Sequence, residues 1–435
     1  MNVKEINASL LCGAIGSRGV FPHLDSLQKS PVIFDIDFGL PELPRDPGII
    51  LIRGARQYGK STWLENQLRQ TIIDFGPGSA QYLNGDELRS DVELADRIRT
   101  AVSMFPSAAA LRRLFIDEIT AVDNWQKVLK RLADAGEIGD LLVITTGSKA
   151  TDLRRGMELL PGRKGKLART SYYFVPLSYA AYTKTAGARL GKNTLAGYLL
   201  SGGCPIAAAE VVANGSVPEF IIEMIRDWIH GECTAAGRDR SSLKGVFDSI
   251  IRYGGTPCGQ AKIARESGLA NNTVAAGYLE FLMDCMCIST SFSWDKERAV
   301  SIRRKPAKYH FINLIAALCW HPDHPVTLAQ FNSLPPATQG LWHEWAVAQE
   351  IWRRAALRGD DFPELMNYWQ SDNHEIDFVA SGGRHIEVKR GSVSPQEYAW
   401  YPHSFPKGNL TLVNAARFET AFCRGMTIED FLLEP

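Results

Sequence analysis

The stretch GARQYGKS, from Gly54 to Ser61, decides the fold of the first part of this chain. It fits the phosphate-binding loop G-x-x-x-x-G-K-[ST] at every fixed position. The apolar run 49–52 before it predicts a buried strand, and residues 61–72 after it predict a helix. A loop in this setting turns successive backbone N–H groups toward an anion at a helix N-terminus. The sequence therefore predicts a nucleotide-binding loop.

Each position of this loop has an expected role. Gly54 and Gly59 permit the backbone geometry that the loop needs. Lys60 is expected to reach the β- and γ-phosphates and Ser61 to hold Mg²⁺, so ATP and Mg²⁺ are the expected ligands. The remaining loop and first-turn positions are expected to contact the nucleotide: Ala55, Arg56, Gln57, Tyr58 and Thr62.

A second carboxylate source follows at LRRLFIDE, residues 111–118. Here an apolar strand ends in Asp117, expected to hold the Mg²⁺ water shell, and Glu118, expected to polarise the attacking water. The apolar run 141–147 leads to Ser148, a candidate γ-phosphate sensor together with Thr145 and Thr146. With the strand expected near 81–87, these runs alternate with helical segments. They predict an α/β fold with a parallel sheet, whose ligands bind at the carboxyl ends of the strands.

Composition sets outer limits on function. Lys+Arg and Asp+Glu number 48 each, so no global charge attracts nucleic acid, and any such site must come from a local patch. No run approaches a membrane span, and the N-terminus lacks signal-peptide features. The cysteines are scattered without a C-x-x-C pair, which indicates reduced, mostly buried thiols and a cytoplasmic protein.

Several of these segments resemble prokaryotic AAA+ ATPases of the signal-transduction type. The resemblance is carried by IILIRGARQYGKSTWL, LFIDE, VITTGS, LPGRKGK, FVPLSYAAY and, in the lid, YLLSGGCP. It implies a helical lid after the ATPase core and a nucleotide contact from Arg163. For a single arginine of the basic stretch 154–169, a solvated loop remains the favoured alternative to a role as arginine finger. Arg113 departs from the pattern, because an apolar residue is usual there.

The middle segment, residues 241–310, has a winged-helix pattern of helices followed by a hairpin, and the resemblance implies a winged helix here. The expected recognition helix carries Glu280 and Asp284 but no Lys or Arg, which argues against reading of bases. A basic group follows where a wing would hold phosphates: Arg298, Arg303, Arg304, Lys305 and Lys308. Protein contact and DNA contact both stay open, with protein contact favoured.

The C-terminal segment carries a helix at 341–354 and then a meander that contains Asp377 and Glu387-x-Lys389. This pattern resembles the PD-(D/E)xK nuclease core. Glu387 and Lys389 lie on one face of a strand, and an antiparallel neighbour can bring Asp377 beside them. Glu350, or with less weight Glu344, could add a carboxylate from the helix.

Such a group could hold a second Mg²⁺ or Mn²⁺ through Asp377, Glu387 and Glu350, with Lys389 activating water. The motif alone is weak, since Glu-x-Lys is common on solvated strands. A helix over 394–401 and a strand over 410–413 are expected to complete the fold. Trp342, Trp345 and Trp352 have helical spacing and are expected to pack in a core.

These observations predict an α/β chain in five parts: an N-terminal segment (1–48), a P-loop core (49–175), a helical lid (176–240), a winged helix (241–320) and a restriction-endonuclease-like domain (325–435). One hypothesis is an ATPase that gates a metal-dependent nuclease acting on DNA, with RNA left open. The other is an ATP-driven switch whose later domains only bind nucleic acid or protein. A homo-oligomer is left open.

Overall fold

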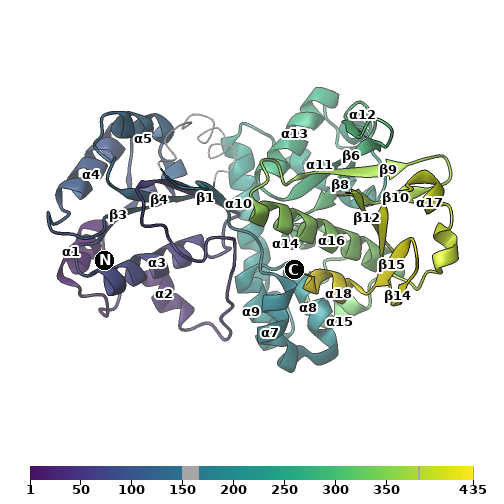
Figure 1. Ribbon diagram of the computed structural model, residues 1–435, viewed down its shortest axis with the longest axis horizontal. Coiled ribbons are helices and arrows are strands. Elements are labelled where there is room, and N and C mark those ends of the chain that lie inside the picture. The colour runs from purple at the N-terminus through teal and green to yellow at the C-terminus, as the bar shows by residue number, and fades with distance from the viewer. Residues whose placement is uncertain (149–165, 381–382, 435) are drawn as a thin grey trace. The chain divides into compact units, whose positions relative to one another are not determined.

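The computed structural model describes residues 1–148, 166–380 and 383–434 (Figure 1). Arg163 therefore lies outside the described residues. The chain divides into two compact units. The first consists of Met1–Ile33, Asp37–Val175 and Ala356–Gly359, and the second of Phe34–Ile36, Pro176–Ala355 and Asp360–Pro435.

The first unit is built on a five-stranded sheet in which every pairing is parallel. Its strands are β1 (Gly48–Arg53), β2 (Ala80–Asn84), β3 (Arg113–Asp117), β4 (Leu142–Gly147) and β5 (Ser171–Tyr173), in the order β2-β3-β4-β1-β5. The predicted parallel α/β sheet is confirmed. Because β3 and β4 lie side by side next to β1, the carboxyl ends of all three meet at one edge.

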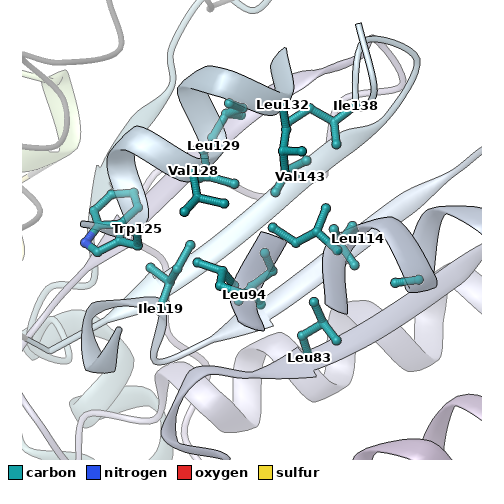
Figure 2. Packing of buried hydrophobic residues seen from close by; sticks show 14 of the residues in the cluster. Leu83, Leu94, Leu114, Ile119, Trp125, Val128, Leu129, Leu132, Ile138 and Val143 are labelled. Carbon is teal, nitrogen blue, oxygen red and sulfur yellow. The ribbon is translucent and has the colours of Figure 1, made fainter. Parts of the chain in front are cut away.

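Helices cover this sheet: α1 (Val3–Cys12), α2 (Pro22–Leu27), α3 (Lys60–Phe75), α4 (Asp91–Ser103) and α5 (Trp125–Asp134). On α5, Trp125, Val128, Leu129 and Leu132 recur at helical spacing and are all buried. They pack with Leu94 of α4 and with strand residues such as Leu114 and Val143 (Figure 2). This apolar layer fixes the strands whose tips form the site.

Arg113, the departure from the expected apolar pattern, is a buried structural residue. Its guanidinium donates to Thr71 Oγ1 on α3 and to the carbonyl oxygens of Leu43 and Pro44, each at 3.0 Å. It also lies over the ring of Phe75. Burial lowers the pKa of Arg113 to about 10. The guanidinium thus ties the start of β3 to α3 and to the segment before β1.

The chain from residue 176 onward contains many helices, some of them before its strands and some after. They are α7 (Tyr179–Leu190), α8 (Thr194–Ser201), α9 (Pro205–Asn214), α10 (Glu219–Ala235), α11 (Arg240–Arg252), α12 (Gln260–Glu266), α13 (Asn272–Asp284), α14 (Leu314–Trp320), α15 (Leu328–Asn332), α16 (Pro336–Arg358), α17 (Tyr401–Ser404) and α18 (Ile428–Leu433). Trp342, Trp345 and Trp352 of α16 are buried, which confirms that they pack in a core.

The Gly-Gly-x-Pro segment joins α8 to α9. Gly202 caps α8 in the left-handed region, and Gly203 also has a positive φ, of 71°. A Cβ on Gly203 would lie 2.9 Å from the carbonyl oxygen of Leu177, whose N–H donates to Gly203 O at 3.0 Å. Pro205 then starts α9 at a position where its missing N–H is no loss. Glycine is therefore required where the segment 176–178 lies against this turn.

The second unit contains a mixed sheet of β6 (Ile288–Asp295), β7 (Val300–Ile302), β8 (Lys308–Phe311), β9 (Leu365–Gln370) and β10 (Glu375–Ile376). On one side β6 pairs antiparallel with β7 and β8. On the other side it pairs in parallel with β9. Strands of the regions 241–320 and 325–435 therefore share one sheet.

A further sheet of the second unit has the order β11-β12-β13-β15-β14. Its strands are β11 (Phe378–Val379), β12 (Arg384–Val388), β13 (Asn409–Val413), β14 (Phe418–Glu419) and β15 (Cys423–Met426). β11 and β12 are antiparallel, whereas β12, β13 and β15 run parallel. The expected strand over 410–413 is thus confirmed within β13.

The helix expected over 394–401 is wrong. Residues Pro395–Tyr398 form a 3₁₀ turn, and α17 begins only at Tyr401. Pro402 lies in the first turn of α17, where its missing N–H is no loss, so the helical residues here begin a separate short helix. All eight cysteines are free, and all but Cys12 are buried. No helix of the described residues has the length and apolar character to cross a membrane.

Candidate functional site

The phosphate-binding loop lies between the end of β1 and the start of α3, as the sequence predicts. Gly59 adopts a left-handed φ of 98° and leads into α3 at Lys60. Lys60 is buried, and its Nζ donates to the carbonyl oxygens of Gly54 and Ala55, both at 2.9 Å. Ser61 lies in the first turn of α3. The lysine ammonium is thus held inside the curve of the loop.

The other predicted loop residues divide by exposure. Tyr58 and Ala55 are buried, whereas Arg56 and Gln57 are exposed, and Thr62 is half-buried in α3. Gln57 has a positive φ of 67°. A Cβ on Gly54 would lie 2.7 Å from Phe174 Cβ, so only glycine fits where the loop passes the end of β5.

Asp117 and Glu118 lie at the tip of β3, beside the tip of β4. Thr146 Oγ1 donates to Asp117 Oδ1, which also accepts from the backbone N–H of Glu118 at 3.2 Å. Glu118 Oε2 accepts from the backbone N–H and the Oγ of Ser148, at 3.1 and 3.0 Å. Arg56 Nε donates to the same Ser148 Oγ at 3.2 Å. Ser148 therefore links the acidic pair to the loop.

Backbone strain accompanies this arrangement. Glu118 has a φ of 45°, in the left-handed region that non-glycine residues seldom adopt. Gly85, after β2, lies against it, because a Cβ on Gly85 would collide with the carbonyl oxygen of Glu118. The site thus needs glycine at 85 so that Glu118 can turn its carboxylate toward Ser148.

The residues of this edge fit Mg²⁺ by the chemistry of their donors. Ser61 offers a hydroxyl and Asp117 a carboxylate, the oxygen ligands that Mg²⁺ takes, usually with waters and substrate phosphates. Ser61 lies in the first turn of α3 directly after the loop, and Asp117 ends β3.

Sequence reasoning missed a residue pair beside this edge. His23 of α2 places Nδ1 2.6 Å from Glu65 Oε1 of α3, and the backbone N–H groups of His23 and Leu24 donate to Glu65 Oε2. The hydrogen bond to Glu65 raises the pKa of His23, and the charge of Asp117 adds to the shift. No local signal joins residues 42 positions apart.

In the second unit the structure brings together Asp377, Glu387 and Lys389. The backbone N–H of Asp377 donates to Glu387 Oε2 at 3.1 Å, and the N–H of Val388 donates to Asp377 Oδ2 at 2.9 Å. Lys389 Nζ lies 2.7 Å from Glu387 Oε1. The convergence that the antiparallel register predicts is therefore present, with Asp377 between β10 and β11 and Glu387 on β12.

Lys308 was expected on an exposed wing, and this expectation is wrong. Its side chain is fully buried on β8, with Nζ 2.8 Å from Asp377 Oδ1 and in an ion pair with Glu375. Arg298, Arg303, Arg304 and Lys305 are exposed, as a wing requires. Lys308 instead belongs to a carboxylate cluster that contains Glu375, Asp377 and Glu387. It is buried there because β8 pairs with residues 288–291 of β6.

The helix carboxylate of this cluster is Glu344, not Glu350. Both oxygens of Glu350 are engaged by Arg353 and Arg354, at 2.7–2.8 Å. Glu344 instead interacts electrostatically with Asp377 and Lys308, and its Oε1 lies 3.4 Å from His310 Nδ1. The two glutamates are six residues apart on α16, so they project from different faces of the helix.

The charges in this cluster shift one another. Burial, and then the charge of Asp377, raise the pKa of Glu344 to about 8, and the same two causes raise the pKa of Glu387 to about 8. Burial also acts to raise the pKa of Asp377, but Lys308 and Lys389 outweigh it and lower that pKa. One carboxylate is thus held ionised while its neighbours favour the protonated form.

The cluster does not fit a divalent cation as it is arranged. All four carboxylate oxygens of Asp377 and Glu387 already lie beside a protein donor, and Lys308 supplies the compensating positive charge. Within residues 1–148, 166–380 and 383–434, no group of three or more His, Cys, Asp or Glu side chains is placed to hold a metal ion. The predicted metal set of Asp377, Glu387 and Glu350 is not assembled.

The loop, the acidic pair and the parallel sheet give the first unit the fold of a P-loop nucleotide-binding domain. Residues 46–183 match the family model of an AAA domain, AAA_14. This part of the chain is therefore similar to AAA domains, which bind ATP with Mg²⁺ in general.

Relatives and solved structures extend the comparison. The chain is 25% identical over 410 residues to the uncharacterized protein MJ1544 of Methanocaldococcus jannaschii, covering 88% of this chain and 83% of the relative. It is 32% identical over 114 residues to MJ1637 of the same organism, covering 26% of this chain and 24% of that protein. The ORC1 protein of Aeropyrum pernix in complex with DNA is similar at 12% identity and a TM-score of 0.31, over 73% of this chain and 92% of that one. The ORC2 protein of Aeropyrum pernix is similar at 10% identity and a TM-score of 0.35, over 72% of this chain and 92% of that one.

Proposed function

We propose that the first unit hydrolyses ATP and that the turnover drives a change in the second unit. The observation that carries the proposal is the meeting of the loop with the tips of β3 and β4, where Ser148 joins Arg56 to Glu118. A glutamate held at this position argues against a domain that binds nucleotide without hydrolysing it.

The roles of the residues follow from their chemistry. Lys60 exchanges its contacts with the loop carbonyls for the β- and γ-phosphates, because phosphate oxygens are stronger partners for an ammonium than neutral carbonyls. Ser61 and Asp117 would hold Mg²⁺, which would neutralise charge that develops on the phosphates. Glu118 takes a proton from the attacking water. Arg163 is proposed to contact the nucleotide as well.

Two substitutions test this assignment in the full chain. Lys60→Ala is expected to lose both ATP binding and hydrolysis. Glu118→Gln is expected to keep binding while turnover falls about 100-fold or more, the usual contribution of a general base. Binding is measured with a fluorescent ATP analogue and turnover by phosphate release. Parent-like turnover in Glu118→Gln would remove that residue from the mechanism.

The second unit is proposed to contain a winged helix. Its support is the succession of α11, α12 and α13, the β6–β7 hairpin, and the bridge between Cys258 and Ala307 that links the segment before α12 to the strand region. The exposed arginines and Lys305 around this hairpin suit phosphate contacts without reading of bases. A protein contact at the same face is the alternative.

DNA binding at this hairpin has a specific signature in salt. The double variant Arg303→Ala/Arg304→Ala is expected to reduce the slope of log K against log salt by about 2, one for each lost phosphate contact. Arg97→Ala, at an exposed position on α4, is the matched control. An unchanged slope in the double variant would favour the protein-contact alternative.

Cleavage of DNA by the second unit is a second candidate function. The convergence of Asp377, Glu387 and Lys389 supports it, because two carboxylates and a lysine at one place are the groups of the PD-(D/E)xK pattern. The ion pairs that close the cluster count against it. The alternative is a switch in which this unit only binds nucleic acid or protein.

The two alternatives separate in one assay. Plasmid and single-stranded DNA are incubated with the protein and Mg²⁺ or Mn²⁺, with and without ATP. Cleavage that is lost in Lys389→Ala, while ATP turnover is kept, would support the nuclease. Dependence of that cleavage on Lys60 would show gating by ATP. Intact DNA under all conditions would reject the nuclease and leave the switch.

A further inference from the structure

Lys308 of the second unit is a lysine whose side chain is fully buried. Its side chain has no exposed surface, yet it carries a cationic group that water normally solvates. Such a group is retained in an interior when anionic partners compensate it. Here the partners are Asp377 Oδ1, at 2.8 Å, and Glu375, which lie on one side of the strand two residues apart.

The remaining carboxylate oxygens of Asp377 and Glu387 also lie beside donors of the protein. Asp377 Oδ2 accepts from the N–H of Val388, and the two oxygens of Glu387 lie beside the Asp377 N–H and Lys389 Nζ. No carboxylate oxygen of Asp377 or Glu387 is left without a protein donor. The positive charge that faces Asp377 comes from Lys308.

His310, the next residue on this face of β8, also faces a carboxylate. His310 is two residues after Lys308, is fully buried, and places Nδ1 3.4 Å from Glu344 Oε1. Its ring also packs against Phe378, 4.9 Å between centroids. Lys308 and His310 of β8 therefore both face carboxylates: Lys308 faces Glu375 and Asp377, and His310 faces Glu344. These contacts close the cluster from the side of the mixed sheet.

We infer that Lys308 is the resident cation of this cluster and that its ammonium excludes divalent metal ions from Asp377 and Glu387. The physical basis is competition for the same oxygens: a divalent cation needs carboxylate ligands that Lys308, Lys389 and backbone N–H groups already occupy. The inference concerns the site of the second candidate function, but it holds or fails whether or not DNA is cut.

The test is Mn²⁺ binding by the full chain without nucleotide, followed by electron paramagnetic resonance and calorimetry. Lys308→Met removes the ammonium and keeps most of the volume. It is expected to bind one Mn²⁺ at least tenfold more tightly than the parent. The gain is expected to vanish in Lys308→Met/Asp377→Asn, which locates the ion at the cluster, and in Lys308→Arg, which restores the charge.

A matched control uses another lysine in an ion pair. Lys244 lies on α11 with Nζ 2.6 Å from Asp248, and both residues are exposed. Lys244→Met is expected to leave Mn²⁺ affinity unchanged. If Lys308→Met does not fold because carboxylates are left unpaired, Lys308→Met/Glu375→Gln removes one charge of each sign and carries the same expectation. Circular dichroism and a cooperative urea transition report folding of each variant.

The outcomes separate the inference from the nuclease proposal. Tight Mn²⁺ binding by the parent, or affinity that does not change in the folded Lys308 variants, would overturn the inference. A gain in Mn²⁺ affinity without DNA cleavage by any variant would keep the inference and reject the nuclease. Cleavage by the parent together with unchanged Mn²⁺ affinity in Lys308→Met would keep the nuclease and reject the inference.

Discussion

Glu118 and Ser148 are joined by two hydrogen bonds, since one carboxylate oxygen of Glu118 accepts from both the backbone N–H and the hydroxyl of Ser148. The bonds run from the tip of β3 to the tip of β4, the strand between β3 and β1. Arg56 of the loop donates to the same hydroxyl. A change at the loop can therefore reach the proposed catalytic carboxylate through one side chain.

Ser148→Ala is expected to lower the turnover number for ATP by about tenfold with little change in ATP affinity. It removes one hydrogen bond to a charged group, typically worth about 1.5–3 kcal/mol, while the backbone N–H still holds the carboxylate. Steady-state phosphate release checks this. Ser103→Ala, at an exposed position on α4, serves as the control. An effect on affinity alone would assign Ser148 to nucleotide binding.

Arg113→Met is expected to destabilise the first unit by about 2–4 kcal/mol. The substitution keeps an apolar stem but leaves the buried carbonyl oxygens of Leu43 and Pro44 without their donor. The adjacent Arg112 provides the control, because it is half-buried in an ion pair with the exposed Asp140, and Arg112→Met should cost less than about 1 kcal/mol. Urea unfolding measures both, and equal costs would contradict the role given to Arg113.

Stability is expected to fall as the pH rises from 7 to 8.5. The folded-state pKa values of Glu344 and Glu387, about 8, lie above the ordinary value of 4.5, so the folded chain binds more protons than the unfolded chain across this window. The stabilisation is fully present below pH 4.5 and is lost as the pH rises through 8. Each proton contributes a slope of at most about 1.4 kcal/mol per pH unit.

Two variants isolate this effect. Glu344→Gln is expected to reduce the slope between pH 7 and 8.5 by about half, because Glu387 still titrates there. Glu419→Gln, at an exposed position, is expected to leave the slope unchanged. Above pH 7 the buried His310, whose pKa burial lowers to about 3, is neutral in both states and adds nothing. If the free energy of unfolding changed with pH by the same amount in the parent and in Glu344→Gln, the raised pKa of Glu344 would be contradicted.

Gly203→Ala is expected to cost about 2 kcal/mol or more. Alanine pays roughly 1–2 kcal/mol for a left-handed conformation, and its Cβ would press on the carbonyl oxygen of Leu177. Gly231 gives the contrast, because a Cβ there has open space within α10. Gly231→Ala should stabilise by up to about 1 kcal/mol. Thermal unfolding of both variants decides whether position 203 is special.

The sequence was sufficient for the features that depend on local pattern. The strand-loop-helix around Lys60, the strand ending in Asp117 and the buried tryptophans of α16 all follow from periodicity and spacing. The expected hairpin also let Asp377 be placed near Glu387, and the antiparallel pairing of β11 with β12 agrees with it. Each of these inferences uses contacts within one element or between neighbours in sequence.

The remaining features depend on contacts that no local pattern encodes. Lys308 has the composition of a basic wing, and only the pairing of β8 with β6 buries it against a residue 69 positions away. The choice between Glu344 and Glu350 depends on which face of α16 meets the cluster. The wrong helix over 394–401 was expected from the usual element order of the nuclease-like fold and not from a pattern in these residues.

The parallel pairing of β6 with β9 has a consequence for synthesis of the protein on the ribosome. Residues 290–293 of β6 find their partners only at residues 365–368. Until those residues emerge, the hairpin of β6 and β7 has an open edge that can pair with another strand. A long contact of this kind also forms late in folding, since the intervening loop must close first. The growing chain therefore depends on rapid completion, or on a chaperone at that edge, during translation of about 75 residues.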